Sequence, residues 1–323
     1  MARTAKSKGK NSLTIGIDLG GTKIAAGLCR EGEVLHKVVV PTNAAQGFDA
    51  VVAAMAEAAR QAMGDTDPAA VRGVGVGAAG QIDSQTGAVL YAPNLNWRQA
   101  PLGQKLAEAL RLPVRVVNDV RAATMAEWKY GAGKGLHSFI NIFLGTGVGS
   151  GLVLNGTLCE GATNTAGEIG HICLDPAGPL CGCGHAGCFE AYSSGRGIEN
   201  EVKRRLQAGA PSALREKVGA RLDQITGPLI GQAAREGDPL ALEVLAWAGR
   251  HLGLVLANLH TLLNPQKILL GGGVMALADF FLPAAREAMH RHILSVADRG
   301  EDLLGRARFE NDAVLLGGSA LFA

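Results

Sequence analysis

The chain has 323 residues, enough for two ordinary domains with a sizeable buried core. Apolar residues make up 47% and charged residues 19%, which excludes a disordered chain, and 31 Lys and Arg against 29 Asp and Glu argue against nucleic acid as an obligatory partner. No apolar run predicts a membrane span, and residues 1–12 form a basic, polar leader without a signal peptide's apolar segment. We therefore expect a flexible tail at 1–12 and a cytoplasmic protein whose thiols stay reduced.

The first third of the chain alternates strand and helix patterns. Residues 12–40 have apolar residues on both sides of a glycine turn, which predicts a hairpin and then a third strand. Residues 48–63 have helical spacing, and 71–79 predict a buried strand. Residues 101–113 predict an amphipathic helix, and 114–119 a strand that runs into a loop. This alternation predicts an α/β layer architecture.

The pattern then restarts. Residues 138–156 again predict strand, glycine turn and strand, an internal echo of the N-terminal hairpin at low identity. From Ile198 onward the chain is mostly helical, except for a strand and glycine turn at 267–274. We place the domain boundary near Asn118–Asp119. The prediction is a small domain at 13–119, with a C-terminal helix at 308–323 packing back on it, and a large domain at 120–307.

One glycine motif admits two interpretations. Residues 75–80, GVGAAG, match the dinucleotide fingerprint G-x-G-x-x-G, but the next residues predict a turn and a strand instead of the helix that this fingerprint opens. We therefore favour a strand that ends in a tight turn. A Walker A loop is not present either, because GAGKG at 131–135 lacks the spacing and the Ser or Thr.

Two other glycine turns are more informative. DLGGTK, at Asp18–Lys23, combines backbone N–H groups that can approach an anion with an acid, Asp18, that can hold a divalent cation through water. GTGVGSG, at Gly145–Gly151, supplies a second N–H-rich hairpin without an acid. Together they predict a two-sided phosphate clamp. The glycines at Gly271–Gly273 would let an adenine ring approach the backbone.

Asp119 follows a predicted strand in the sequence NDV. It is a candidate N-cap for the next helix, which is the commoner role for such an acid. It is also a candidate general base, because phosphoryl transfer to an alcohol needs a positioned carboxylate that accepts the hydroxyl proton. Both roles are compatible.

A cysteine cluster predicts a metal site. Cys181, Cys183 and Cys188 have the spacing C-x-C-x₄-C, and one imidazole would complete a tetrahedral zinc shell. His171 and His185 are the candidates for the fourth ligand, and His171 is favoured because it would tie down a separate segment. A closed shell leaves no position for substrate, so the zinc would be structural. Unpaired thiols are the alternative, and the C-x-x-C of a thioredoxin-type site is missing.

These motifs together resemble one known family. DLGGTK, PNLNW, ND, GTGVGSG, GEIGH and CGCGHAGC followed by a glutamate resemble the ROK family (repressors, open reading frames, kinases) of actin-like sugar kinases. The resemblance covers the chain from Leu13 onward, and the combination of EIGH with the cysteine motif is its most specific part. It implies an α/β fold of two actin-like (ribonuclease H-like) domains, with ATP and a sugar in the cleft between them.

The resemblance also implies roles for individual residues. Asp119 would be the general base that deprotonates the sugar 6-hydroxyl. The sugar hydroxyls would be bound by Asn94, Asn118, Glu168, His171 and Glu190. The ATP contacts would be Gly20, Gly21, Thr22, Lys23, Gly145, Thr146, Gly147, Gly271 and Gly272, with Asp18 near Mg²⁺. Zinc would be held by His171, Cys181, Cys183 and Cys188, in a loop at 171–190 that aims the sugar ligands.

Two positions depart from the family pattern. Arg121 stands where the family usually has ND-x-N, and Ser150 replaces a common glycine in the second phosphate turn. Neither departure removes a catalytic group.

The resulting functional hypothesis is an ATP-dependent hexose kinase that phosphorylates glucose. The alternatives are an N-acetylmannosamine or N-acetylglucosamine kinase, and a sugar-responsive repressor. The repressor is disfavoured because the 17 residues before Asp18 predict no helix-turn-helix domain. Polyphosphate remains open as a donor. We expect no nucleic-acid or membrane partner, and a homodimer or a dimer of dimers.

Overall fold

The computed structural model describes residues 13–294 and 300–323, so the predicted tail at 1–12 lies outside the described residues. By its internal contacts the chain divides into two compact units. Unit 1 contains the residues up to Gly135, Glu160–Ala166 and Arg308–Ala323, and unit 2 contains Leu136–Cys159 and Gly167–Ala307. The chain therefore passes between the units four times.

Unit 1 is built on a five-stranded sheet in the order β3-β2-β1-β4-β8. The first three strands are antiparallel, and β4 and β8 continue the sheet in parallel with β1. The bounds of these strands are β1 Leu13–Leu19, β2 Lys23–Arg30, β3 Glu33–Pro41, β4 Val71–Ala78 and β8 Val114–Asn118. A small second sheet is formed by β5 Gln81–Asp83, β6 Ala88–Ala92 and β7 Trp97–Ala100.

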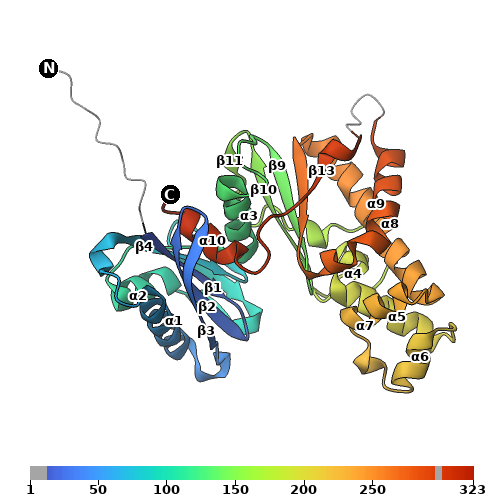
Figure 1. Ribbon diagram of the computed structural model, residues 1–323, viewed down its shortest axis with the longest axis horizontal. Helices are drawn as coiled ribbons and strands as arrows, with labels where there is room; N and C mark the ends of the chain where they lie inside the picture. Colours follow the sequence, from blue (N-terminus) through green and yellow to red (C-terminus); the bar gives the residue numbers. More distant parts are fainter. Residues whose placement is uncertain (1–12, 295–299) are drawn as a thin grey trace. The chain divides into compact units, whose positions relative to one another are not determined.

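Helices cover both faces of the larger sheet of unit 1 (Figure 1). One face carries α1 Phe48–Met63 and α2 Leu102–Leu110, and the other carries α3 Asp119–Tyr130 and α10 Ala313–Ala320. Because α3 packs on α10 and β4, it belongs to unit 1. The compact unit thus extends beyond residue 119, where the sequence analysis places the boundary.

Side-chain alternation along β1 explains this layering. Ile15 and Ile17 join the core under α1, whereas Gly16 faces α10. A Cβ atom at Gly16 would lie 1.9 Å from the carbonyl oxygen of Leu315, and a Cβ at Gly75 would lie 1.9 Å from that of Gly318. Gly75, the first glycine of GVGAAG, therefore lets α10 pack directly against β4. The residues after this motif form the strand β5 and not a helix, as the strand-and-turn interpretation predicts.

Unit 2 repeats the topology of the larger sheet. Its strand order is β11-β10-β9-β12-β13, with an antiparallel hairpin at β9 and β10 and parallel strands at β12 and β13. The bounds are β9 Phe139–Leu144, β10 Val148–Leu154, β11 Thr157–Leu158, β12 Lys267–Gly271 and β13 Leu304–Arg306. The internal echo predicted from sequence is thus confirmed as one topology used twice.

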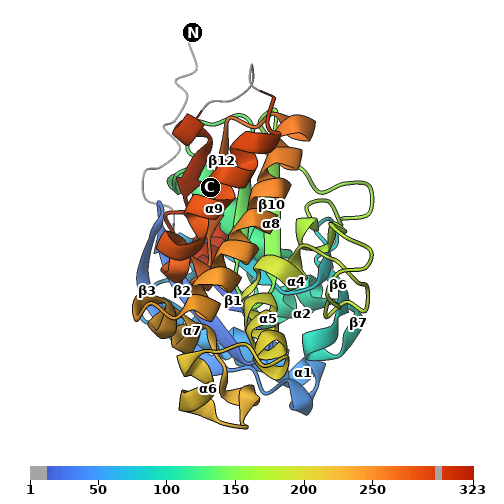
Figure 2. The same cartoon turned by 90° about the vertical axis from the view of Figure 1, so that its right-hand side faces the viewer.

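The helices of unit 2 bury its main core against β9 and β12. Their bounds are α4 Glu190–Ser193, α5 Gly195–Gln207, α6 Ala213–Val218, α7 Gly227–Arg235, α8 Pro239–Leu263 and α9 Ala278–His292. In length and composition α8 alone among the described helices would suffice to cross a membrane, but 61% of its most apolar window is buried inside the structure. It lies beside α9 (Figure 2), so α8 is a core helix.

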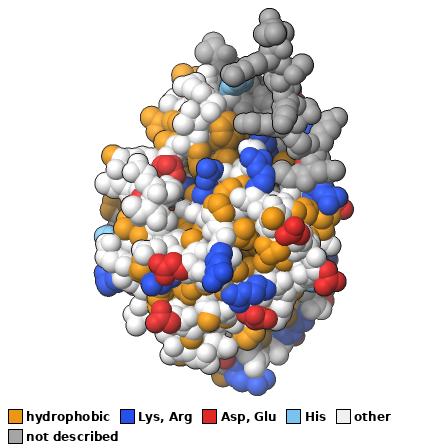
Figure 3. All heavy atoms as spheres, turned by 90° about the vertical axis from the view of Figure 1, so that its left-hand side faces the viewer, with side chains coloured by type: hydrophobic (Ala, Val, Ile, Leu, Met, Phe, Trp, Pro, Cys, Tyr) orange, Lys and Arg blue, Asp and Glu red, His pale blue; other side chains and the backbone are white. Residues whose placement is uncertain are grey.

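Charged side chains are mixed on the face of the molecule drawn in Figure 3. Lys and Arg lie among Asp and Glu there, with apolar side chains scattered between them. Among the described residues on this face, positive and negative charges are therefore interspersed, and neither forms a large patch.

Candidate active site

Two carboxylates lie at the carboxyl ends of parallel strands in unit 1. Asp18 is near the end of β1, and Asp119 follows β8 directly. Gly77 of β4 lies between them in the sheet: it is the register partner of Asp18, and a Cβ on it would lie 3.3 Å from the Cα of Asp119. Ligands of open α/β sheets bind at this edge.

The pKa of Asp18 is raised by its surroundings. Burial, and then the charge of Asp119, raise the pKa of Asp18 to about 6, against smaller opposing effects of Lys23 and Lys37. A buried carboxyl with a raised pKa beside a second carboxylate forms an environment that a divalent cation would neutralise. The donor set therefore fits Mg²⁺ at Asp18.

The glycine turn after Asp18 is closed by hydrogen bonds at both ends. Gly20 N–H donates to the Lys23 carbonyl over 3.0 Å, and the Thr42 hydroxyl donates to the Gly20 carbonyl over 2.7 Å. The side chain of Asn94 borders this turn, because its Cβ lies 3.2 Å from the place of a Cβ on Gly21. The structure thus brings the predicted sugar ligand Asn94 to the predicted phosphate turn.

The N-cap of α3 is Asn118. Its side-chain oxygen accepts hydrogen bonds from the backbone N–H groups of Val120 and Arg121, and its Nδ2 donates to the Gly80 carbonyl over 3.2 Å. The N-cap role considered for Asp119 was therefore wrong: Asn118 is the cap, and Asp119 accepts the N–H of Val120 at 2.9 Å from within the first turn. Asp119 is the first residue of the helix, half-buried at its positive end.

The second glycine turn joins β9 to β10 in unit 2. Gly145 N–H donates to the Gly147 carbonyl, and the first N–H of α5, from Gly195, donates to the Gly145 carbonyl over 2.8 Å. Glu190 borders the same turn, with Oε2 accepting the backbone N–H of Val148 over 2.9 Å. These hydrogen bonds hold the turn against the N-terminus of α5, the positive end of that helix, and such a position suits an anion.

A cavity of about 650 Å³ lies beside this turn within unit 2. Such a volume is typical of small-molecule sites. Its wall contains three of the residues predicted to contact the nucleotide, Gly145, Thr146 and Gly273, and the sequence analysis missed the others. The full lining is Gly145, Thr146, Gly195, Arg196, Ile198, Glu199, Gly227, Pro228, Arg235, Gly273, Val274, Ala276 and Leu277. The third glycine of the GGG motif thus lines the cavity, whereas a Cβ on Gly272 would meet the backbone of Leu144 at 2.5 Å.

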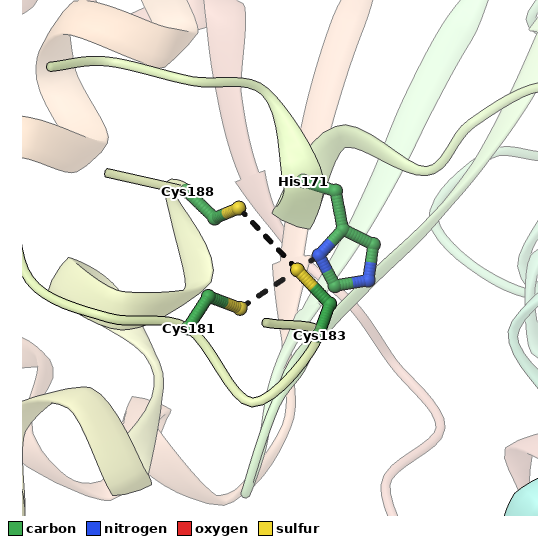
Figure 4. A group of neighbouring side chains, drawn as sticks. All are labelled: His171, Cys181, Cys183 and Cys188. Carbon is green, nitrogen blue, oxygen red and sulfur yellow. Dashed lines mark hydrogen bonds between the residues drawn. The ribbon is translucent and has the colours of Figure 1, made fainter. Parts of the chain in front are cut away.

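The four predicted zinc ligands lie together in unit 2. One donor atom from each of His171, Cys181, Cys183 and Cys188 lies within 4.8 Å of the others (Figure 4). The Cys183 and Cys188 sulfurs are 3.6 Å apart, and the Cys181 sulfur is 3.9 Å from Nδ1 of His171. Zinc–sulfur bonds of about 2.3 Å in a tetrahedron require sulfurs about 3.8 Å apart, so the residues fit the ion.

The alternative ligand, His185, lies outside this group of four. Its Nδ1 is 3.6 Å from the Cys183 sulfur only. A hydrogen bond from the backbone N–H of His185 is the largest of the effects that lower the pKa of the Cys183 thiol. A lower pKa favours the thiolate, which is the form that binds zinc. His171, and not His185, therefore completes the group of four side chains that could hold the ion.

The remaining predicted sugar ligands adjoin the zinc group. Glu168 is exposed and immediately precedes η4, Ile169–His171. Glu190 begins α4, and its Oε1 accepts from the Cys181 sulfur at 3.5 Å. One local structure in unit 2 therefore carries Glu168, His171 and Glu190.

Comparison with known proteins identifies the family. The model of the ROK family matches residues 14–323. The chain belongs to the ROK family. A glucokinase from Streptomyces coelicolor is 40% identical to it over 314 residues, covering 96% of this chain and 97% of the relative.

Solved structures of ROK proteins share the fold. The crystal structure of a ROK family glucokinase from Streptomyces griseus, in complex with glucose and AMPPNP, has a TM-score of 0.79 at 37% identity and covers 96% of this chain and 98% of that one. A ROK family transcriptional regulator, a homologue of the E. coli MLC protein, has a TM-score of 0.82 at 32% identity and covers 96% and 78%. The chain thus has the actin-like fold of ROK sugar kinases, and its glucokinase relatives support a sugar phosphotransferase.

Proposed function

We propose that this ROK protein is an ATP-dependent hexose kinase that transfers the γ-phosphoryl group to the 6-hydroxyl of glucose. The observation that carries the proposal is the acid pair of unit 1, with Asp119 beside Asp18 and next to a glycine turn of the phosphate-binding kind. The likeness to glucokinases supports glucose as the substrate.

In this proposal Asp119 is the general base. Its carboxylate accepts the proton of the 6-hydroxyl as the oxygen attacks the γ-phosphorus, and ADP leaves. Positioned base catalysis of this kind contributes roughly 10²–10⁴ in rate. Asp18 would hold Mg²⁺, which neutralises charge on the phosphates when it is bound. The turns at Gly20–Lys23 and Gly145–Gly147 would donate backbone N–H groups to the phosphates, and the cavity of unit 2 would take the nucleoside.

The sugar hydroxyls would be bound by Asn94, Asn118, Glu168, His171 and Glu190. His171 can serve both zinc and sugar, because Nδ1 faces the three sulfurs while the other ring nitrogen points away from them (Figure 4). A zinc ion on Nδ1 leaves a neutral ring whose Nε2 carries the proton, so this nitrogen donates to a hydroxyl oxygen. Zinc would thereby fix the tautomer as well as the loop.

A substrate panel tests the activity. Glucose, mannose and the 2-acetamido analogues of glucose and mannose are assayed with ATP, and glucose also with polyphosphate. Phosphorylation of glucose with the highest kcat/KM is the expected result. Preference for an acetamido sugar would favour the N-acetylhexosamine kinase instead, and turnover of no sugar would contradict the proposal.

A matched pair of variants tests the base. Asp119→Asn should lower kcat by at least about 10²-fold while glucose binding, measured by titration calorimetry, is retained. The control is Asp83→Asn, which changes a half-buried carboxylate at the end of β5 in the same unit. Substantial turnover by Asp119→Asn would remove Asp119 from this role.

The likeness to a transcriptional regulator keeps a second candidate, a sugar-responsive repressor. A gel-shift assay with genomic DNA fragments, with and without glucose, distinguishes it from the kinase. We also propose that the protein is a homodimer, which light scattering after size-exclusion chromatography measures.

A further inference from the structure

Arg121 is a buried cation next to the proposed base. It is the third residue of α3, its exposed fraction is 4%, and its guanidinium donates through one nitrogen, Nη2. The acceptors are the backbone carbonyls of Asn164 at 2.8 Å, Ala166 at 3.1 Å and Glu160 at 3.3 Å. A buried charge is costly unless hydrogen bonds compensate it, so the position of these carbonyls is strongly constrained.

The three carbonyls belong to one short loop of unit 1. The segment Glu160–Ala166 is closed by a hydrogen bond from Ala166 N–H to the Glu160 carbonyl, and the Ser84 hydroxyl donates to the Glu160 carboxylate over 2.6 Å. The loop thus directs three of its carbonyl oxygens at the Arg121 guanidinium. Its last residue, Ala166, is two residues before Glu168.

Ser150 holds the next carbonyl along the chain. It is buried in β10, and its hydroxyl donates a short hydrogen bond to the carbonyl of Gly167. Arg121 and Ser150 therefore hold the consecutive carbonyls of Ala166 and Gly167, each within its own unit. These are the two positions at which the sequence departs from the family pattern.

We propose that Arg121 and Ser150 are positioning residues that clamp the backbone at Ala166–Gly167 and so place the carboxylate of Glu168 for binding the sugar. The inference rests on the proposed function, in which Glu168 binds a sugar hydroxyl. Although Ser150 belongs to the GTGVGSG motif, it lies in β10 beyond the turn at Gly145–Gly147, and its hydroxyl donates to the Gly167 carbonyl. The Arg121 guanidinium likewise donates to the loop at 160–166. The clamp therefore acts on the sugar side of the reaction. Its loss therefore weakens sugar use more than ATP use.

Kinetics with single and double variants test the clamp. Arg121→Ala and Ser150→Ala should each raise KM for glucose about tenfold, with KM for ATP changed less than about twofold. The double variant should lose less than the product of the two effects, because both side chains hold one segment. Added methylguanidinium should lower KM for glucose in Arg121→Ala and leave Ser150→Ala unchanged. Equal effects on both substrates, or no rescue, would overturn the positioning role.

Arg60→Ala is the matched control, because the Arg60 guanidinium also donates to a backbone carbonyl, that of Ala109 at 2.9 Å, on the exposed side of α1. It should leave both KM values unchanged. If Arg121→Ala fails to fold, Arg121→Lys takes its place: it keeps the charge without the planar fork, so it should raise KM for glucose to a lesser extent.

Hydrogen exchange separates failure of the clamp from failure of the proposed function. In the wild-type protein and the two single variants, amide exchange is followed over residues 160–171 and 20–23. Faster exchange at 160–171 alone supports the clamp even if no sugar is phosphorylated. Unchanged exchange at 160–171 in both variants would overturn it, whatever the activity.

Discussion

Asp18→Asn should stabilise unit 1 when Mg²⁺ and nucleotide are absent. Burial and the Asp119 carboxylate raise the pKa of Asp18 from 3.8 to about 6 in the folded chain. A carboxyl with a raised pKa binds its proton more tightly in the folded chain than in the unfolded one. Its stabilising contribution is therefore complete below about pH 4 and is lost as the pH rises to about 6. The amide of Asn carries no charge and avoids this loss.

The size of the effect follows from the pKa difference. About two pKa units at about 1.4 kcal/mol each give an upper bound of ~3 kcal/mol in the free energy of unfolding. Partial solvent access of Asp18 reduces this bound, so we expect ~1–3 kcal/mol above pH 6. For a unit of this size, each kcal/mol raises the melting temperature by about 2–4 °C.

Thermal unfolding in EDTA at pH 4 and at pH 7.5 measures the difference. The variant and the wild type should melt together at pH 4, and the variant should melt higher at pH 7.5. Addition of Mg²⁺ and ATP should reverse the order, because only the wild type holds the cation. Asp83→Asn is the control, since hydrogen bonds from Thr86 and Gln85 lower the pKa of this carboxyl and the variant should gain nothing at pH 7.5. A gain by Asp18→Asn that is equal at both pH values would refute the electrostatic reasoning.

Three further changes test the structure. Glu127→Gln should lower the free energy of unfolding by about 1–3 kcal/mol, because this buried carboxylate accepts the backbone N–H groups of Arg308 and Phe309 at 2.7 Å each; urea unfolding measures it. Gly75→Ala should cost at least about 3 kcal/mol or prevent folding, since its Cβ would overlap the backbone of α10, and yield and circular dichroism report this. Cys183→Ser should lower bound zinc, measured by mass spectrometry, together with the melting temperature.

Each of these changes has a comparison that isolates its cause. Gly135→Ala has open space around the new methyl group, although its positive φ adds some strain, so it should cost much less than Gly75→Ala. Cys29→Ser changes a cysteine outside the zinc group and should leave the metal content at the wild-type value. A Glu127→Gln variant as stable as the wild type would mean that these N–H groups find other acceptors. Full zinc content in Cys183→Ser would exclude this thiol as a ligand.

Local patterns predicted the elements, because they depend on neighbouring residues. The alternation around the glycine turn predicted β1 and β2, and helical spacing predicted α1 at its observed bounds. The cysteine spacing predicted which side chains lie together, since a short loop has few ways to gather three sulfurs. In each case the information lies within about twenty residues of sequence.

Long-range partners could not be predicted in the same way. The place of α3 in unit 1 depends on α10, which lies far along the chain. The cavity residues Glu199 and Arg235 come from separate helices, joined when Glu199 accepts the backbone N–H of Gly227. The acceptors of Arg121 are backbone carbonyls, which every residue supplies, so no residue type in the loop identifies them.

Because α10 packs against β1 and β4, the two units cannot complete folding at the same time during synthesis. Every residue of unit 2 emerges from the ribosome before Ala313, whereas the first strands of unit 1 emerge long before it. The second actin-like domain can therefore reach its native state while the first still exposes the face of its sheet that carries Gly16 and Gly75. Chains that end before Ala313 and have left the ribosome should carry one protected domain and one that proteases cut.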